Sequence, residues 1–263
     1  MIQRPFCSGW HDSLQYHAIA GEHVFAARVF WTGSVWHHSM WLYDDGVHEV
    51  VNSTAPLAQS SAEFADLTGE RFKLHAPDDA VTIEASGERD VSMVLVPRAS
   101  FDGPSPIGPG LHHPNMRVEI CYDGKQLTGD GYCKRYDFRG EPIRYWGYRF
   151  VQGFSSERDW AVWTADATFG LEKHAYFRTI EGDDDVTMAA DHQSCHRDDH
   201  AYGVLEAVDV DVELEQLGLW ESRIHSAEMD SLMTQRFCRM TVSAAGWVES
   251  GFAINELCFG TLG

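Results

Sequence analysis

The sequence predicts an all-β protein with very little helix, folded as two β-barrels in tandem or as a barrel plus a β-sandwich. About fifteen short segments are rich in β-branched and aromatic residues and are separated by Gly, Pro, Asp or Ser clusters, which is typical of strands. Two Asp-Gly pairs, Asp45-Gly46 and Asp123-Gly124, predict tight hairpin turns. The strand segments divide into two halves of similar number, without the repeat of a propeller. We therefore expect two domains, 1–124 and 125–263.

In the first half, the opening through about Glu22 reads as irregular, and strands follow. The expected strands are Val24–Trp31, Ser34–Tyr43, Val47–Val51, Arg71–His75, Ala80–Ala85 and Val91–Pro97. The segment Pro56–Glu70 is mildly amphipathic, and it is the one good helix candidate in this half. Phe101–Pro114 contains four prolines and three glycines, so we expect an irregular linker between domains or a loop over a barrel mouth.

In the second half, aromatic-rich strand segments follow one another closely. The expected strands are Asn115–Tyr122, Gly131–Phe138, Ile143–Gly153, Trp160–Phe169, Lys173–Thr179, Val186–Ala190, Gly203–Leu214, Trp220–Ile224, Leu232–Ser243 and Trp247–Phe259. A turn near Gly246 is expected to link the last two. Asp191–His200 reads as a charged loop or a short helix.

Composition limits the function. The chain has 263 residues, and its apolar fraction of 44% is enough for a substantial core. The formal net charge of −20 makes nucleic acid and anionic membrane surfaces unfavourable partners. No apolar run approaches the roughly 20 residues of a membrane helix, and the first residues lack the apolar region of a secretory signal. Six scattered cysteines without a C-x-x-C pair suggest free thiols, so we expect a cytoplasmic protein.

Ionisable residues lie among aromatic ones between Gly129 and Arg178, which predicts a site there. Asp166 is the first choice for a proton-transferring acid, since burial and nearby carboxylates can bring a carboxyl group toward neutral pKa. The assisting groups would be His174 or Asp137, with Glu172 tuning the acid. The alternative is that the same residues form structural ion pairs, Asp166–Arg178 or Glu172–Arg149.

A hydrophobic or aromatic ligand would need apolar walls and polar contacts. The residues expected to supply these are Tyr132, Tyr145, Trp146, Tyr148 and Tyr176, with Arg149 or Lys134 pairing with a substrate carboxylate and His113 on a mouth loop. Any single aromatic is more often plain core, and either cation could instead lie on a solvated face. His112 and His113 point in opposite directions on an extended chain, as do His37 and His38, one of which would face the core.

The motifs GDGYCKRYDF, YWGYRF and WAVWTADATFG, with the closing GFAINEL, resemble the hydroxyneurosporene synthase family, also called the carotenoid 1,2-hydratase or AttH-like family. The resemblance covers about residues 129–170 and 247–259. It implies tandem lipocalin-like β-barrels and, for members that hydrate an isoprenoid double bond, Asp and His directly before the Trp-Gly pair. Here Arg144 and Tyr145 occupy those places, so the fold carries over and the family's acid does not.

These observations predict an enzyme that acts by acid–base chemistry on a hydrophobic small molecule, isoprenoid or aromatic, without a cofactor. The reaction would be that of a hydratase or dehydratase (a hydro-lyase), a cyclase or an isomerase; G-x-S-x-G, P-loop and G-x-G-x-x-G motifs are absent. One alternative is a non-catalytic lipocalin-like carrier. Another is a metal-dependent enzyme that uses His192, His196 and His200, which would line one face of a helix. The oligomeric state is left open.

Overall fold

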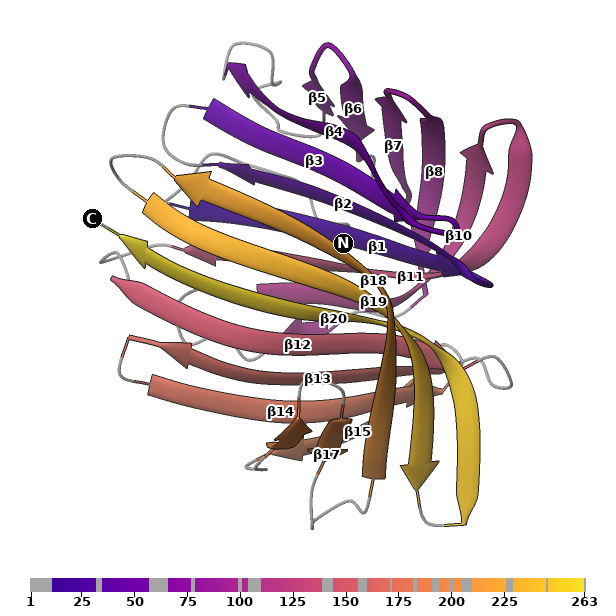
Figure 1. Ribbon diagram of the computed structural model, residues 1–263, viewed down its shortest axis with the longest axis vertical. Helices are drawn as coiled ribbons and strands as arrows, with labels where there is room; N and C mark the ends of the chain where they lie inside the picture. The colour runs from indigo at the N-terminus through magenta and orange to yellow at the C-terminus, as the bar shows by residue number, and fades with distance from the viewer. Residues whose placement is uncertain are drawn as a thin grey trace. The chain divides into compact units, whose positions relative to one another are not determined.

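The structure, a computed structural model, consists of strands and turns wherever it describes the chain (Figure 1). The described residues are 11–31, 35–56, 66–76, 79–98, 101–103, 110–138, 144–155, 160–170, 172–181, 184–190, 194–198, 201–204, 210–225, 229–244 and 246–262. They belong to two compact units, Met1–Pro142 and Ile143–Gly263. The expected all-β fold is confirmed. In these ranges, no helix has the length and hydropathy that crossing a membrane requires.

Unit 1 is one antiparallel sheet of eleven strands, in the order β4-β3-β2-β1-β11-β10-β8-β7-β6-β5 with β9 paired to β10. The strands are β1 (His11–Ala20), β2 (His23–Trp31), β3 (Val35–Tyr43), β4 (Val47–Pro56), β5 (Asp66–Thr68), β6 (Phe72–His75), β7 (Val81–Ser86), β8 (Asp90–Pro97), β9 (Phe101–Gly103), β10 (Gly110–Tyr122) and β11 (Lys125–Phe138). Arg71 connects the β4 end of this order to β7, because its guanidinium donates to the carbonyls of Val50 and Ser86, each at 2.7 Å.

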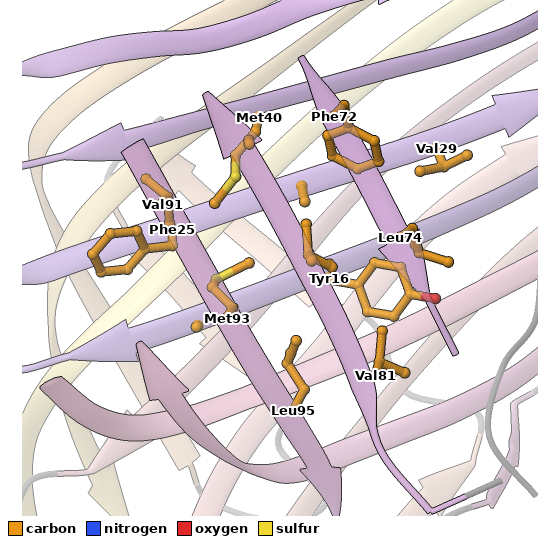
Figure 2. Packing of buried hydrophobic residues seen from close by; sticks show 14 of the residues in the cluster. Tyr16, Phe25, Val29, Met40, Phe72, Leu74, Val81, Val91, Met93 and Leu95 are labelled. Carbon is orange, nitrogen blue, oxygen red and sulfur yellow. The ribbon is translucent and has the colours of Figure 1, made fainter. Parts of the chain in front are cut away.

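The core of unit 1 lies on one face of this sheet, which we call the core face. Apolar residues alternate with polar ones along β7 and β8, so that one side of each strand is buried. Figure 2 shows the result: side chains of β6–β8, such as Leu74 and Met93, face those of β1–β3, such as Tyr16 and Phe25. Because burying apolar surface is the main favourable term in folding, this packing holds the sheet in its curled form.

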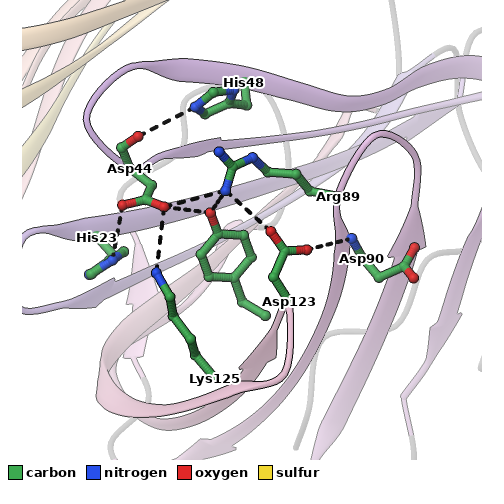
Figure 3. A network of polar contacts seen from close by, with 8 residues as sticks. His23, Asp44, His48, Arg89, Asp90, Asp123 and Lys125 are labelled. Carbon is green, nitrogen blue, oxygen red and sulfur yellow. Dashed lines mark hydrogen bonds and ion pairs between the residues drawn. The ribbon is translucent and has the colours of Figure 1, made fainter.

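A polar network lies at the turns of unit 1 (Figure 3). Asp44, in the β3–β4 turn, accepts a hydrogen bond of 2.6 Å from the Tyr122 hydroxyl and ion-pairs with Arg89 at 3.3 Å. His23 and Lys125 approach the same carboxylate at 3.3 and 3.8 Å. The network therefore ties together turns that are far apart in the sequence.

Unit 2 is an antiparallel sheet of nine strands, in the order β15-β14-β13-β12-β20-β19-β18-β17-β16. The strands are β12 (Tyr145–Ser155), β13 (Trp160–Phe169), β14 (Glu172–Glu181), β15 (Asp184–Ala190), β16 (Ser194–Asp198), β17 (Ala201–Val204), β18 (Val210–His225), β19 (Met229–Ala244) and β20 (Trp247–Leu262).

The two units repeat one topology, since reading β12–β15 for β1–β4 and β20-β19-β18-β17-β16 for β11-β10-β8-β7-β6 reproduces the order. Gly129 and Gly251 show which residues of the two units are equivalent. A Cβ added at Gly129 would lie 2.0 Å from the Ile19 carbonyl oxygen, and one at Gly251 would lie 1.9 Å from that of Phe154. These matching approaches make Lys134 of β11 and Glu256 of β20 equivalent positions.

Three expectations from the sequence differ from the structure. The expected domain boundary, between 124 and 125, falls in the β10–β11 turn, because β11 pairs with β1 and β10 and belongs to unit 1. The opening is regular: β1 is a strand because it pairs on both sides, with β2 and β11. The expected helix at Pro56–Glu70 contains the strand β5, and its residues 57–65 lie outside the described part of the chain.

The proline-rich segment Phe101–Pro114 is also more regular than expected. It contributes β9 and the first part of β10, which pair with each other. The ladder between β10 and β11 shifts register between His113 and Met116. Pro114 falls in this bulge, where a residue without an N–H is tolerated.

Candidate functional site

The sequence-predicted site residues are divided between the two units. His113, Tyr132 and Asp137 belong to β10 and β11 of unit 1. The others lie on β12, β13 and β14 of unit 2: Tyr145, Trp146, Arg149, Asp166, Glu172, His174 and Tyr176. The predicted set is therefore not one cluster on one sheet, and each part is described below by itself.

The register of unit 2 separates Asp166 from His174. Asp166 pairs with Ala175 on β14, whereas His174 pairs with Ala167. Since neighbouring residues of a strand occupy opposite faces, Asp166 is on one face of the sheet and His174 on the other. The partner of Asp166 on its other side is Arg149 of β12.

The register between β13 and β14 also gives the positions of Glu172 and Arg178. Glu172 and Arg178 pair with Phe169 and Trp163, so both are on the face opposite Asp166. The register thus separates Asp166 from His174 and Glu172, and it does not favour the alternative ion pairs Asp166–Arg178 and Glu172–Arg149. The catalytic roles of Asp166, His174, Glu172 and Asp137 stay predictions.

A buried carboxylate that was not among the predicted site residues lies at the centre of this sheet. Glu256 of β20 is 0% exposed. The Tyr148 hydroxyl donates to its Oε1 at 2.7 Å, and the Gln235 side-chain amide donates to its Oε2 at 2.5 Å. Burial of a carboxylate is costly unless hydrogen bonds compensate it, and here each oxygen has a donor. We call Glu256, Tyr148 and Gln235 the Glu256 site.

Strand pairing places these three side chains together. Glu256 pairs with Phe150 on one side and with Gln235 on the other. Tyr148 is two residues before Phe150 and so shares its face. Phe150 is 1% exposed, whereas Tyr148 is only partly buried. Tyr148 is thus more accessible than Phe150, and its hydroxyl connects the buried Glu256 carboxylate to the less buried part of this face.

The face that carries Glu256 also carries two predicted residues. Phe150 pairs with Ala165, which pairs with Tyr176. Tyr148 pairs with Ala167, which pairs with His174. Glu256 therefore shares a face with His174 and Tyr176, as does Glu172 of β14, and Asp166 with Arg149 is on the opposite face.

Tyr145 and Trp146, expected as walls of a ligand site, have different surroundings. Tyr145 is 42% exposed. Trp146 packs over Gly260 of β20, where an added Cβ would lie 1.9 Å from its ring. The role of Trp146 that the structure shows is packing across the strand pair, in the space that the glycine leaves.

His37 and His38, the adjacent histidines of unit 1 considered in the sequence, are both residues of strand β3. His38 is on the core face, 1% exposed, stacked on Phe72 and bonded through Nε2 to the Ser53 hydroxyl at 2.7 Å. Burial, and then the neighbouring His37, lower the pKa of His38 to about 4. His38 is the core-facing member of the pair, as expected, and it is neutral near pH 7.

The backbone does not support the alternative of a metal site formed by His192, His196 and His200 on a helix. Residues 194–198, with His196 among them, form strand β16 instead of the helix that would align three histidines. His192 and His200 lie outside the described residues. In the part of the chain that the structure describes, no group of three or more His, Cys, Asp or Glu side chains could hold a metal ion.

Most of the thiols that the structure describes are buried. Cys133, Cys238 and Cys258 are buried and Cys121 is half-buried, and all four are free, as expected. Burial raises the pKa of Cys238 to about 12 and also raises that of Cys133. Such thiols carry little of the nucleophilic thiolate near neutral pH.

One sequence signal could have identified Glu256. The motif GFAINEL, which carries part of the family resemblance, places an acidic residue within an otherwise apolar strand. An acid at such a position is buried on either face of a covered sheet and needs hydrogen-bonding partners. Tyr148 and Gln235 come from two other strands, so only the register reveals them as those partners.

Comparison with known proteins identifies the fold. No protein-family model and no curated protein sequence matches this chain. Among solved structures, a protein assigned as an AttH from Nitrosomonas europaea superposes with a TM-score of 0.66 at 12% identity, covering 94% of this chain and 92% of that one. Kievitone hydratase from Nectria haematococca gives 0.67 at 7% identity, covering 95% and 88%.

A third structure, CghA, gives a TM-score of 0.64 at 8% identity, covering 94% of this chain and 87% of that chain. Identities this low establish the fold and do not transfer a function. The chain therefore shares its all-β, lipocalin-like fold over nearly its whole length with the protein assigned as an AttH, with kievitone hydratase and with CghA.

Proposed function

We propose that this protein is a cofactor-independent enzyme that acts by acid–base chemistry on a hydrophobic small molecule, as a hydratase or dehydratase, with the Glu256 site as its proton-transferring centre. The observation that carries the proposal is the fully buried Glu256 carboxylate with the Tyr148 hydroxyl 2.7 Å from it. Buried ionisable groups with specific partners are characteristic of catalytic sites. The same proton transfers would serve an isomerase or a cyclase.

In the hydration direction, water adds across a carbon–carbon double bond, forming one C–O and one C–H bond. In this step Glu256 acts as the proton acceptor, with Tyr148 and Gln235 donating to its oxygens. Tyr148 takes a proton from the attacking water while its own proton passes to Glu256. The proton of the new C–H bond comes from a second group, for which His174 is the candidate because it shares the face of Tyr148.

The surroundings of the carboxylate support a hydrophobic substrate. Phe150 and Ile254 are buried on the same face, next to Glu256 along β12 and β20. Kievitone hydratase, by its name an enzyme that acts on kievitone by hydration, has the same fold. An isoprenoid or aromatic alkene is the substrate class that these observations favour.

One observation favours a non-catalytic carrier as the second candidate. Both oxygens of Glu256 are held by donors of the protein itself, Tyr148 and Gln235, as in a structural polar network. A carrier would bind the same hydrophobic molecules unchanged. Activity measurements on the Glu256 site therefore decide between the two.

The experiment is to incubate the protein with a panel of terpenoid and phenolic alkenes and alcohols and to detect gain or loss of water by mass. Glu256→Gln should abolish turnover, and Tyr148→Phe should lower it at least about 100-fold, the usual contribution of one proton-transferring group. Glu249→Gln is the matched control, because Glu249 is also a buried β20 carboxylate, bonded to Ser155 at 2.5 Å. No turnover by the wild type on any member, with binding retained, would favour the carrier.

Asp166→Asn belongs in the same assay, since Asp166 was the acid expected from the sequence. Loss of turnover in Glu256→Gln with turnover retained in Asp166→Asn assigns the transfer to Glu256. The reverse result would return it to Asp166 and its register partner Arg149.

A further inference from the structure

We propose that unit 2 carries a surface through which two copies of this chain associate as a dimer. The surface consists of exposed apolar side chains on the sheet face opposite Glu256, and we call it the apolar patch: Tyr145, Leu219, Leu232 and Phe259. The inference does not depend on the proposed function, because no member of the patch belongs to the Glu256 site.

Strand register places the patch residues on one face of four neighbouring strands. Leu232 of β19 pairs directly with Phe259 of β20, which pairs with Gly147 of β12. Tyr145 is two residues before Gly147 and so shares its face. Leu219 of β18 is on the same face by its pairing with β19. The exposed apolar side chains therefore gather on one surface instead of being scattered singly.

The exposure of these side chains fits a docking surface. Phe259 is 54% exposed, Tyr145 42%, Leu219 40% and Leu232 39%. An aromatic ring that is more than half exposed protrudes from the sheet and does not line a cavity. Together the four side chains present roughly 300 Å² of surface, a size at which a contiguous apolar patch often marks an interaction site. An interface of standard size covers about 800 Å² per partner, so the patch would form its apolar centre.

The ring of Phe259 is held in place before any partner binds. It lies over Gly147, where an added Cβ would be 3.2 Å from the ring. A side chain that is already ordered loses less entropy on association. The repeated topology does not require an aromatic residue here, because Asp137 follows Gly129 in unit 1 at the same spacing as Phe259 follows Gly251.

The charges around the patch favour a second copy as its occupant. With 40 acidic and 20 basic residues, two copies of the chain repel each other in general. The register gives this face equal numbers of arginines and acidic residues: Arg149, Arg223, Arg236, Glu221, Asp230 and Asp166. Arg223 and Asp230 are exposed and 2.9 Å apart, so a two-fold axis would bring each near its opposite in the other copy. This surface therefore complements itself.

The test is sedimentation velocity at about 10 μM protein, above the weakest dissociation constants of interfaces of this size. The wild type should sediment as a dimer, with twice the chain mass of 29.6 kDa. Phe259→Asp and Leu232→Asp should each raise the dimer dissociation constant at least about 30-fold, because each places like charges at the centre of the contact. Val248→Asp is the matched control: Val248 is a 65% exposed residue of β20 on the face of Glu256, and the dimer should persist.

A wild type that sediments as a monomer at this concentration would overturn the proposal, and this measurement needs no variant to fold. A dimer that survives both Phe259→Asp and Leu232→Asp would also overturn it. A monomer that binds the neutral probe N-phenyl-1-naphthylamine, with affinity lost in Phe259→Asp, would assign the patch to a hydrophobic small molecule instead. Because the substituted side chains are exposed, all three variants should keep the wild-type midpoint of urea unfolding.

Discussion

The two units of this chain have one topology and different chemistry. Gly129 and Gly251 make the same close approach to a neighbouring strand, and the residues that follow them alternate between the same two faces. Yet the matching positions hold Lys134 in one unit and Glu256 in the other, both buried. Glycines and strand pairing therefore determine this fold, whereas single residues on it determine the chemistry.

The turns of the two units differ as well. In unit 1, Tyr122 at the end of β10 and Asp123 in the β10–β11 turn join the network around Asp44 (Figure 3). The equivalent turn of unit 2, between β19 and β20, has the sequence Ala244-Ala245-Gly246 and so has no side chain for such a network. The shared feature is the glycine with positive φ, 77° in one turn and 90° in the other.

The largest effect is expected at the paired glycines. Gly129→Ala and Gly251→Ala should each destabilise the protein by more than about 4 kcal/mol, since the new methyl group would overlap a backbone carbonyl that cannot move without breaking the sheet. Urea denaturation followed by circular dichroism measures this. Gly46→Ala is the control, because its Cβ would make ordinary contact with His48 at 3.9 Å.

An effect below about 1 kcal/mol at either glycine would show that the two strand pairs are not equally close. A large loss at both positions would show that the repeated topology depends on the same contact in each unit.

A smaller effect is expected at the Asp44 network, whose Tyr122 and Asp123 correspond to alanines in the sequence of unit 2. Asp44→Ala should cost about 3 kcal/mol, because it leaves Arg89 and the Tyr122 hydroxyl without the carboxylate between them. Tyr122→Phe, which removes one hydrogen bond, should cost about 1 kcal/mol. Urea-unfolding midpoints test both, and equal losses in the two variants would contradict the view of Asp44 as the hub.

The sequence was sufficient for the fold class and for most strands, because strand periodicity and turn residues are local signals. Asp123-Gly124 forms the expected hairpin turn, with positive φ at both residues. The sequence was insufficient to predict β1, because the regular structure of this strand comes from pairing with β11, which is distant in the chain. The candidate site shows the same limit: the sequence was sufficient to recognise a same-face set within β14, but the relation of this set to Asp166 depends on the register between strands.

A pH effect of about 2 kcal/mol is expected from His38 of unit 1. Its pKa is about 4 in the folded protein and about 6.5 when unfolded, so the unfolded state binds more protons between these values. This contribution to stability is fully present above pH 6.5 and is lost as the pH falls toward 4. The difference in unfolding free energy between wild type and His38→Gln should therefore change by about 2 kcal/mol between pH 7 and pH 4.5.

Comparing the change across pH in the two proteins cancels the titration of the many carboxylates that they share. An identical pH dependence in wild type and His38→Gln would show that His38 titrates normally and is not a neutral part of the core.

The smallest effects are expected at exposed ion pairs, and there the two units should behave alike. Lys73–Glu84 in unit 1, at 3.3 Å, and Arg239–Glu215 in unit 2, at 2.5 Å, each join neighbouring strands. All four side chains are about half exposed or more. Water and salt screen such charges, and fixing two long side chains costs entropy, so each coupling should be below about 0.5 kcal/mol. Double-mutant cycles with alanine measure the couplings. A coupling above about 1 kcal/mol in one unit would mean that surface charge, and not only the buried residues at equivalent positions, distinguishes the two sheets.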